Sequence, residues 1–184
     1  MKHKGLIAVV LSVAALAGCN AQKQHAMALE DAQVSLAEQF PERAQLQLDK
    51  ADRIARENRL KTGIESQVLR AEALLQMGQV EQAQQIAQQI AADYVPGTIQ
   101  RAQAEELLAK VAIRQGRFLD AQMNLSEADR SYTSPVDKAR INDLLNLVRG
   151  LEAWSGGRTV AAKTHWDSIV DKDLRSSVLA HAEQ

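Results

Sequence analysis

The residues that could act as metal ligands, nucleophiles or bases are few in this chain and widely scattered. Its four histidines share no metal-ligand spacing, and its single cysteine is Cys19. A zinc site or a catalytic pair needs several such side chains brought together, usually at short and regular spacings. Neither a His-Glu-x-x-His run nor a Gly-x-Ser-x-Gly run occurs. We therefore expect a protein that is not an enzyme, with no catalytic residue, no metal site and no cofactor.

Two further groups of residues could suggest chemistry, and both have a simpler explanation. Glu105 and Glu106, with Asp129, could form an acid pair, but adjacent residues on a helix point in different directions. A solvated helix face is the usual setting for such charges, and we expect it here. Gly156-Gly157 lacks the strand and the lysine of a phosphate loop, so we expect a turn between helices.

Cys19 closes a sequence that is typical of an exported protein. Residues 2–4 are basic, residues 5–15 are apolar and Leu16-Ala17-Gly18 precedes the cysteine. The apolar run has the length of a signal peptide and is too short to span a bilayer comfortably. The pattern resembles the lipobox of bacterial lipoproteins. The resemblance implies that residues 1–18 are a signal peptide and that Cys19 becomes a diacylated, N-acylated terminus; the alternative is an ordinary secretory signal with an incidental buried cysteine.

The same resemblance implies a location. Several acyl chains on one residue anchor a protein firmly, because each buried methylene contributes about 0.8 kcal/mol. In lipoproteins an aspartate after the cysteine commonly signals retention in the inner membrane, and the residue here is Asn20. The resemblance therefore implies an outer-membrane, lipid-anchored protein that faces the periplasm. Residues 19–24 would form the lipidated N-terminus and a short polar linker to a domain at residues 25–184.

Composition favours helices and a balanced charge. Without residues 1–18 the chain keeps about 166 residues, and 20 of its 22 basic side chains face 23 acidic ones. This balance argues against a nucleic-acid partner and against a polybasic membrane patch. Alanine, glutamine, leucine, glutamate and arginine dominate, and they are good helix formers. We therefore expect an all-α fold, with Pro41, Pro96 and Pro135 at helix boundaries.

A seven-residue sequence phrase recurs four times along the chain. Its central residues are Gln39, Gly78, Gly116 and Gly157, which gives spacings of 39, 38 and 41 residues. Such a period is typical of helical repeat arrays. The three glycines can take the left-handed conformation that ends the first helix of each pair. In the weakest copy Gln39 stands where the others have glycine.

Small and apolar residues recur in register with these turns. Small residues stand seven positions before and five positions after each centre, where two antiparallel helices would approach closely. Apolar residues follow nine and twelve positions after it, which completes one helical stripe. The first set is Ala32, Ala71, Ala109 and Gly150, then Ala44, Ala83, Ala121 and Ala162. The second set is Leu48, Ala87, Leu125 and Trp166, then Ala51, Ile90, Ala128 and Ile169.

This arrangement resembles the tetratricopeptide repeat over residues 25–172. The resemblance implies an antiparallel helix-pair solenoid of about four repeats, although the period exceeds the usual ~34 residues. A generic antiparallel bundle is the alternative. The expected helix pairs are 25–38 with 41–57, 62–77 with 79–93, 98–114 with 117–131, and 136–155 with 158–172. A capping helix should follow at residues 173–182, with Asp173 as its N-cap and Leu174, Val178 and Leu179 facing the array.

In tetratricopeptide arrays the first helices line a concave groove, and the repeat register assigns residues to it. The groove would change from mixed charge to apolar at its C-terminal end, where a partner's helix or strand could bind. Alternatively, the capping helix fills that end. Trp166 occupies one of the apolar positions of the repeat, so we expect it in the core and not in the groove. The candidate partner-binding residues are Glu72, Lys110, Arg114, Leu144, Leu147, Leu151 and Trp154.

Together, the lipobox and the repeat resemblance imply a binding module at a membrane. Small lipoproteins of this repeat class resemble assembly factors, such as the pilotins of type IV pili and secretins. We therefore expect a protein partner in the envelope, a secretin or another outer-membrane assembly component, with membrane contact through the lipid anchor and no nucleic acid. One alternative is a regulator of a cell-wall or envelope-polysaccharide enzyme. A hydrolase is the weakest alternative, because no nucleophile, base or metal site is recognisable.

Overall fold

The computed structural model describes the backbone of residues 4–182 and the side chains of residues 20–180. Every regular element in this part of the chain is an α-helix. None of the helices, within the residues described, combines the length and hydropathy that crossing a membrane requires. The side chain of Cys19 and those of the proposed signal peptide lie outside the described residues. The chain divides into two compact units, Met1–Gln79 and Val80–Gln184.

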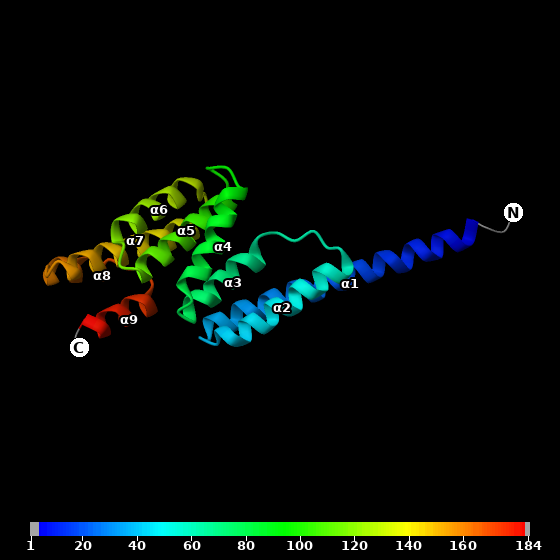
Figure 1. Cartoon of the computed structure of the whole chain (residues 1–184), viewed down its shortest axis with the longest axis horizontal. Helices are drawn as coiled ribbons and strands as arrows, with labels where there is room; N and C mark the ends of the chain where they lie inside the picture. Colours follow the sequence, from blue (N-terminus) through cyan, green and yellow to red (C-terminus); the bar gives the residue numbers. More distant parts are fainter. Residues whose placement is uncertain (1–3, 183–184) are drawn as a thin grey trace. The chain divides into compact units, whose positions relative to one another are not determined.

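The first unit contains α1 (Lys4–Ala37), α2 (Pro41–Asn58) and α3 (Glu65–Gln76) (Figure 1). α1 packs along α2, and both helices contact α3. Their shared core consists of Ala32, Leu36, Ala44, Leu48 and Ala73. The expected linker at residues 19–24 is part of α1, because no glycine or proline interrupts it. Ala21, before the expected domain boundary at residue 25, is already buried.

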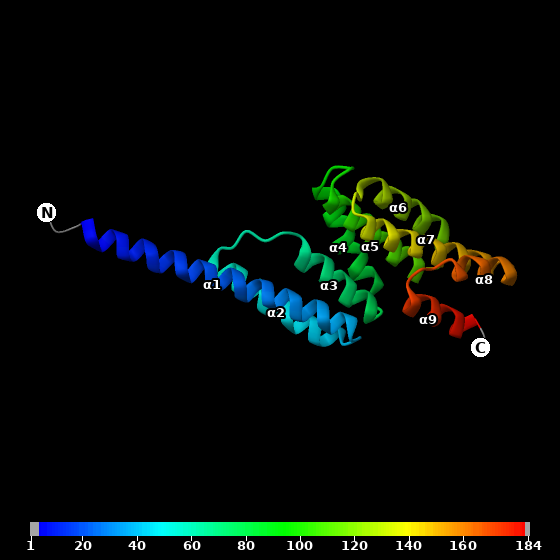
Figure 2. The ribbon, with the colours of Figure 1, turned by 180° about the vertical axis from the view of Figure 1, so that it is seen from behind.

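The second unit contains six helices in which consecutive members pack against each other. They are α4 (Val80–Asp93), α5 (Ile99–Arg114), α6 (Phe118–Ser131), α7 (Pro135–Ser155), α8 (Thr159–Asp167) and α9 (Lys172–Ala182). Both ribbon views show α5, α6 and α7 lying side by side (Figures 1 and 2). One core lies among these three helices, and a second joins α7, α8 and α9.

The four turn centres share one backbone conformation. Gln39, Gly78, Gly116 and Gly157 have φ values of 63°, 74°, 71° and 73°. In each turn the N–H of the central residue donates to the carbonyl three residues back. The N–H of the next residue donates to the carbonyl five residues back, which completes a Schellman motif. The recurring phrase is therefore a repeated structural unit.

The repeated small and apolar positions form the interior. The side chains at the four positions of the register are buried in every copy, Gly150 and Trp166 included. Pro41 and Pro135 occupy the first turns of α2 and α7, and Pro96 lies between α4 and α5. The predicted fold class, an all-α repeat of antiparallel helix pairs with a C-terminal capping helix, is confirmed.

The C-terminal helices depart from the expected details. α8 ends at Asp167 and not near residue 172. The N-cap assigned to Asp173 is wrong, because the carboxylate of Asp171 accepts the backbone N–H groups of Asp173 and Leu174 at 2.9 and 3.0 Å. An Asp at the cap satisfies N–H groups of the first turn that have no partner within the helix. Leu174, Val178 and Leu179 pack inward, as predicted.

Candidate binding surface

Four of the predicted partner-binding residues lie along α7 and form what we call the α7 surface. They are Leu144, Leu147, Leu151 and Trp154. Their spacing of three, four and three residues places them along one side of a helix. Ile141 and Val148 of the same helix are fully buried in the core that α7 shares with α5 and α6. Ile141, Leu144, Val148 and Leu151 follow one another at spacings of three, four and three residues, so the buried residues and the α7 surface form one continuous apolar stripe along α7.

The α7 surface becomes more exposed toward the C-terminal end of the helix. Leu144 is half-buried and packs against the α5–α6–α7 core. Leu147 and Leu151 are half-buried against Ala153, Ala162, Trp166 and Ile169. Trp154, at the end of the surface, remains 41% exposed.

A second tryptophan fixes the position of Trp154. The two ring centroids of Trp154 and Trp166 are 5.7 Å apart, and the rings are tilted by 40°. Trp166 is buried, and its indole N–H donates to the carbonyl of Leu147 at 3.3 Å. Gly150 leaves the space for this indole, since a Cβ there would overlap Nε1 and Cδ1 of Trp166. Trp154 thus rests on a rigid support and not on a mobile loop.

The capping helix shares the hydrophobic cluster beneath the α7 surface. Leu174, Val178 and Leu179 of α9 pack against the same four buried residues as Leu147 and Leu151. The alternative in which α9 fills the apolar end therefore applies to the part of the surface around these leucines. Trp154 is the large apolar side chain of this surface that stays exposed.

The segment before α9 is attached to α7 by a buried carboxylate. Asp143 is buried on α7, and its two oxygens accept the backbone N–H groups of Val170 and Asp171 at 2.8 and 2.9 Å. Hydrogen bonds to a charged acceptor are stronger than neutral ones, so this carboxylate ties the segment between α8 and α9 to α7. The sequence offered no periodic signal for Asp143, because its partners lie 27 and 28 residues away.

The charged candidates occupy different settings. Lys110 is half-buried on α5, and its ammonium lies 3.1 Å from the carboxylate of Glu106. Arg114 is exposed in the last turn of α5. Glu72 is half-buried on α3, in the first unit. Lys110 therefore has a structural ion pair, and Arg114 is the more accessible cation.

The solvated setting expected for Glu105 and Glu106 is wrong, because their side chains are 5% and 4% exposed. They do point apart, as adjacent helical residues should. Glu105 accepts from Arg101 at 2.6 Å, and Arg101 also donates to the carbonyl of Ala91 on α4. Glu106 lies on the other side of α5, where it contacts Arg140 of α7.

Glu106 is the centre of a buried polar cluster that joins three helices. It pairs with Lys110 and Arg140, and it accepts from the hydroxyl of Tyr132 at 3.2 Å. The Arg140 guanidinium lies 5.6 Å from the Tyr132 ring centroid and also pairs with Asp137 at 2.8 Å. The cluster therefore holds the N-terminal part of α7 against α5 and the end of α6. The spacing of Glu106 and Lys110, four residues apart, was the signal in the sequence.

The pKa values in this cluster follow from burial and charge. Burial alone would raise the pKa of Glu106, but the charges of Lys110 and Arg140 and their hydrogen bonds lower it below its ordinary value of 4.5. Burial, together with the charge of Glu106, raises the pKa of Tyr132 to about 12. Burial would lower the pKa of Arg140, and the charge of Glu106 raises it instead. All three groups keep one protonation state near neutral pH.

The buried polar cluster and the α7 surface differ in how accessible their side chains are. Across the residues described, no group of three or more His, Cys, Asp or Glu side chains could hold a metal ion. The polar side chains around Glu106 already have partners on neighbouring helices. The α7 surface instead presents a tryptophan, supported by Trp166, beside half-buried leucines. A half-exposed aromatic on a rigid element is a typical anchor for a protein partner.

No protein-family model matches this chain, and no similar protein was found among curated proteins or solved structures.

Proposed function

We propose that this protein is a lipid-tethered repeat scaffold that binds a protein partner through the α7 surface and assists assembly of an envelope machine. The observation that carries the proposal is the exposed Trp154, supported by Trp166 and adjoined by half-buried leucines. Tryptophan is enriched among the residues that contribute most to protein–protein affinity. The occupant would be an apolar segment of a partner, an outer-membrane assembly component of the secretin class.

The lipid anchor on Cys19 is part of the same proposal. The sequence around Cys19 resembles a lipobox, and Asn20 is compatible with transfer to the outer membrane. A partner in the same membrane would then meet the α7 surface at a raised local concentration, because both molecules are confined to one surface. The lipid would therefore contribute to recognition as well as to location.

The test compares two apolar-to-alanine variants of the membrane-attached protein. Trp154→Ala should weaken capture of the partner roughly 30-fold, since a central aromatic contributes about 2 kcal/mol or more. Val160→Ala is the matched control, because Val160 is 81% exposed on α8 and is not part of the α7 surface. Helicity should stay unchanged in both. Equal capture by Trp154→Ala and by the parent protein would exclude the α7 surface as the binding site.

Deletion of the protein distinguishes the proposed assembly role from the alternative role as an enzyme regulator. If the protein is pilotin-like, its loss should disperse or mislocalise a multimeric outer-membrane channel. If it instead regulates a cell-wall or envelope-polysaccharide enzyme, channel assembly should be normal and wall or polysaccharide synthesis should change. Fractionation of the channel and wall labelling in the same deletion strain separate these two outcomes.

A further inference from the structure

Basic side chains are concentrated at one end of the first unit. Within residues 53–61, four basic residues accompany a single acidic residue, Glu57. A fifth basic residue stands on α1, and all five side chains are exposed. We call them the α2-end basic cluster. Its members are Lys23, Arg53, Arg56, Arg59 and Lys61. The near-neutral total charge of the chain conceals this local excess.

These five cations differ from most other arginines of the molecule. Arg70, Arg117 and Arg130 each have an acidic partner within 2.9 Å. Among the described residues, no ion pair includes a member of the α2-end basic cluster. The cluster therefore presents its full charge outward, where it can meet an anionic surface.

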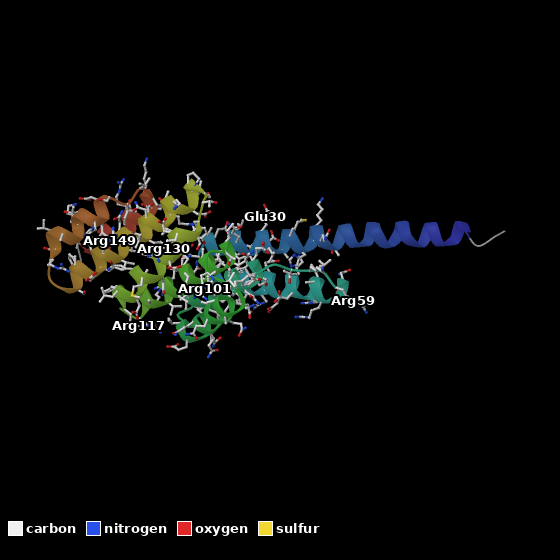
Figure 3. All side chains as sticks on the ribbon, turned by 90° about the horizontal axis from the view of Figure 1, so that it is seen from above. Glu30, Arg59, Arg101, Arg117, Arg130 and Arg149 are labelled. Carbon is white, nitrogen blue, oxygen red and sulfur yellow. The ribbon has the colours of Figure 1, made fainter. Side chains whose placement is uncertain are left out.

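The cluster is held at a fixed place beside the start of the packed domain. Figures 1 and 3 show the end of α2, where Arg59 is labelled, alongside α1. Arg59 ends the helix in the left-handed conformation, and Leu60 closes the turn by donating to the carbonyl of Ala55 at 2.9 Å. Ala21 on α1 is buried. No flexible linker separates this packed end from Cys19, since α1 runs through both residues.

This geometry places the cluster close to any membrane that holds Cys19. Lys23, the member of the cluster on α1, follows Cys19 by four residues of helix, which span about 6 Å and so less than the Debye length of about 8 Å at physiological salt. We propose that the α2-end basic cluster binds the anionic phospholipid headgroups of the membrane in which Cys19 is anchored, an inference that rests on the proposed lipid anchor. Each basic residue near an anionic surface strengthens binding about fivefold. The cluster would fix the orientation of the first unit on the membrane.

The experiment uses the whole protein, extracted from membranes and reconstituted into vesicles. The substitution Asn58→Cys places a thiol within the cluster, on an exposed side chain, for a polarity-sensitive fluorophore. One set of vesicles contains phosphatidylcholine alone, and the other also contains phosphatidylglycerol. The probe should report lipid contact only on the anionic vesicles. The contact should disappear in about 1 M NaCl, where the Debye length is about 3 Å.

Charge removal provides the matched comparison. In the probe-bearing protein, Arg56→Gln with Arg59→Gln and Lys61→Gln should shift the contact equilibrium roughly a hundredfold toward the free form. Arg149→Gln with Arg158→Gln and Lys172→Gln removes three exposed charges from the second unit and should leave the contact unchanged. Equal probe signals on both kinds of vesicle, or on the parent and the first triple variant, would overturn the proposal.

Thiol labelling of the denatured parent protein, in which a buried but free thiol would also react, separates this failure from failure of the anchor. An acylated Cys19 cannot react, so a parent protein that takes up the reagent overturns the anchor and the cluster proposal together. If Cys19 does not react and the fluorophore at position 58 gives the same signal on neutral and anionic vesicles, only the cluster proposal is overturned. Partner capture through Trp154 is measured independently of both results.

Discussion

The last repeat fills its interior with a different pair of residues from the other three. At the first small position it has Gly150 where the others have alanine, and at the following apolar position it has Trp166 where two others have Leu48 and Leu125. The missing methyl group of Gly150 is the space that the indole occupies. The two substitutions compensate each other, and together they create the support for Trp154.

Gly150→Ala should therefore destabilise the protein by about 1–3 kcal/mol. Alanine gains about 0.5–1 kcal/mol of helix propensity over glycine, but overpacking against Trp166 outweighs that gain. Adding Trp166→Leu should restore most of the loss, because it recreates the alanine–leucine pair found in two of the other repeats, Ala32 with Leu48 and Ala109 with Leu125. Urea unfolding measures both effects.

Gly156→Ala is the control for this experiment, since a Cβ at Gly156 would meet its nearest atoms at an ordinary 3.6 Å. We expect its free energy of unfolding to change by less than about 0.5 kcal/mol. Independent, additive losses from Gly150→Ala and Trp166→Leu would contradict the compensation.

Because Glu106 is buried and charged, the free energy of unfolding should depend on pH in the acid range. Its pKa in the folded protein lies below 4.5, so its contribution is present above the unfolded-state pKa and is lost as the pH falls through the folded-state pKa. Glu106→Gln should cost about 2 kcal/mol at pH 7, because Arg140 loses a charged hydrogen-bond acceptor. The difference between parent and variant should shrink steadily below about pH 4.5.

Urea unfolding at several pH values provides the measurement, and Glu127→Gln is its matched control. Glu127 pairs with Arg130 at 2.6 Å on the surface, and we expect less than about 0.5 kcal/mol from its loss at any pH. A pH-independent cost of Glu106→Gln would contradict the assignment of its charge to this cluster.

Single residues also show where sequence reasoning reached its limit. The burial of Trp166 could be predicted from its place in the repeat. Its contact with Trp154 could not be predicted, because that contact depends on ring orientation. Glu106 was expected in solvent because its partners Tyr132 and Arg140 are 26 and 34 residues distant along the chain. Such long-range pairing has no local pattern in a single sequence.

At the scale of elements, the repeat is defined by the shared conformation of its turns. A residue other than glycine pays a steric cost in the left-handed conformation, and Gln39 adopts it with φ 63°. Gln39→Gly should therefore stabilise the protein by about 1 kcal/mol. Thermal unfolding measures the change.

Gly78→Ala supplies the reverse comparison. No atom lies within 4 Å of a Cβ placed at Gly78, so its backbone conformation, with φ 74°, is the reason for glycine there. We expect a loss of about 1 kcal/mol. If Gln39→Gly and Gly78→Ala both left the unfolding temperature unchanged, the shared turn geometry would not contribute to stability.

The helices themselves were largely predictable, because apolar spacing and turn residues are local signals. α2, α4, α5 and α6 begin and end within one residue of the expected positions. α1 extends into residues 19–24, because polarity alone does not end a helix. α8 is short because the backbone of Val170 and Asp171 binds Asp143 instead of continuing the helix.

At the scale of the whole molecule, two features have complementary roles in the proposed function. The first unit contains Cys19 and carries the α2-end basic cluster. The second unit carries the α7 surface, with Trp154 at its most exposed end. Attachment and recognition are thus assigned to different compact units of one chain.

The most direct test of the central claim is photo-crosslinking in living cells. A photoreactive residue at position 154 should yield a discrete product with one envelope protein, and the same residue at position 160 should not. The product should weaken when Cys19→Ser removes the tether, because the local concentration of the partner falls. Equal products from positions 154 and 160, or no product from position 154 in the tethered protein, would contradict the account.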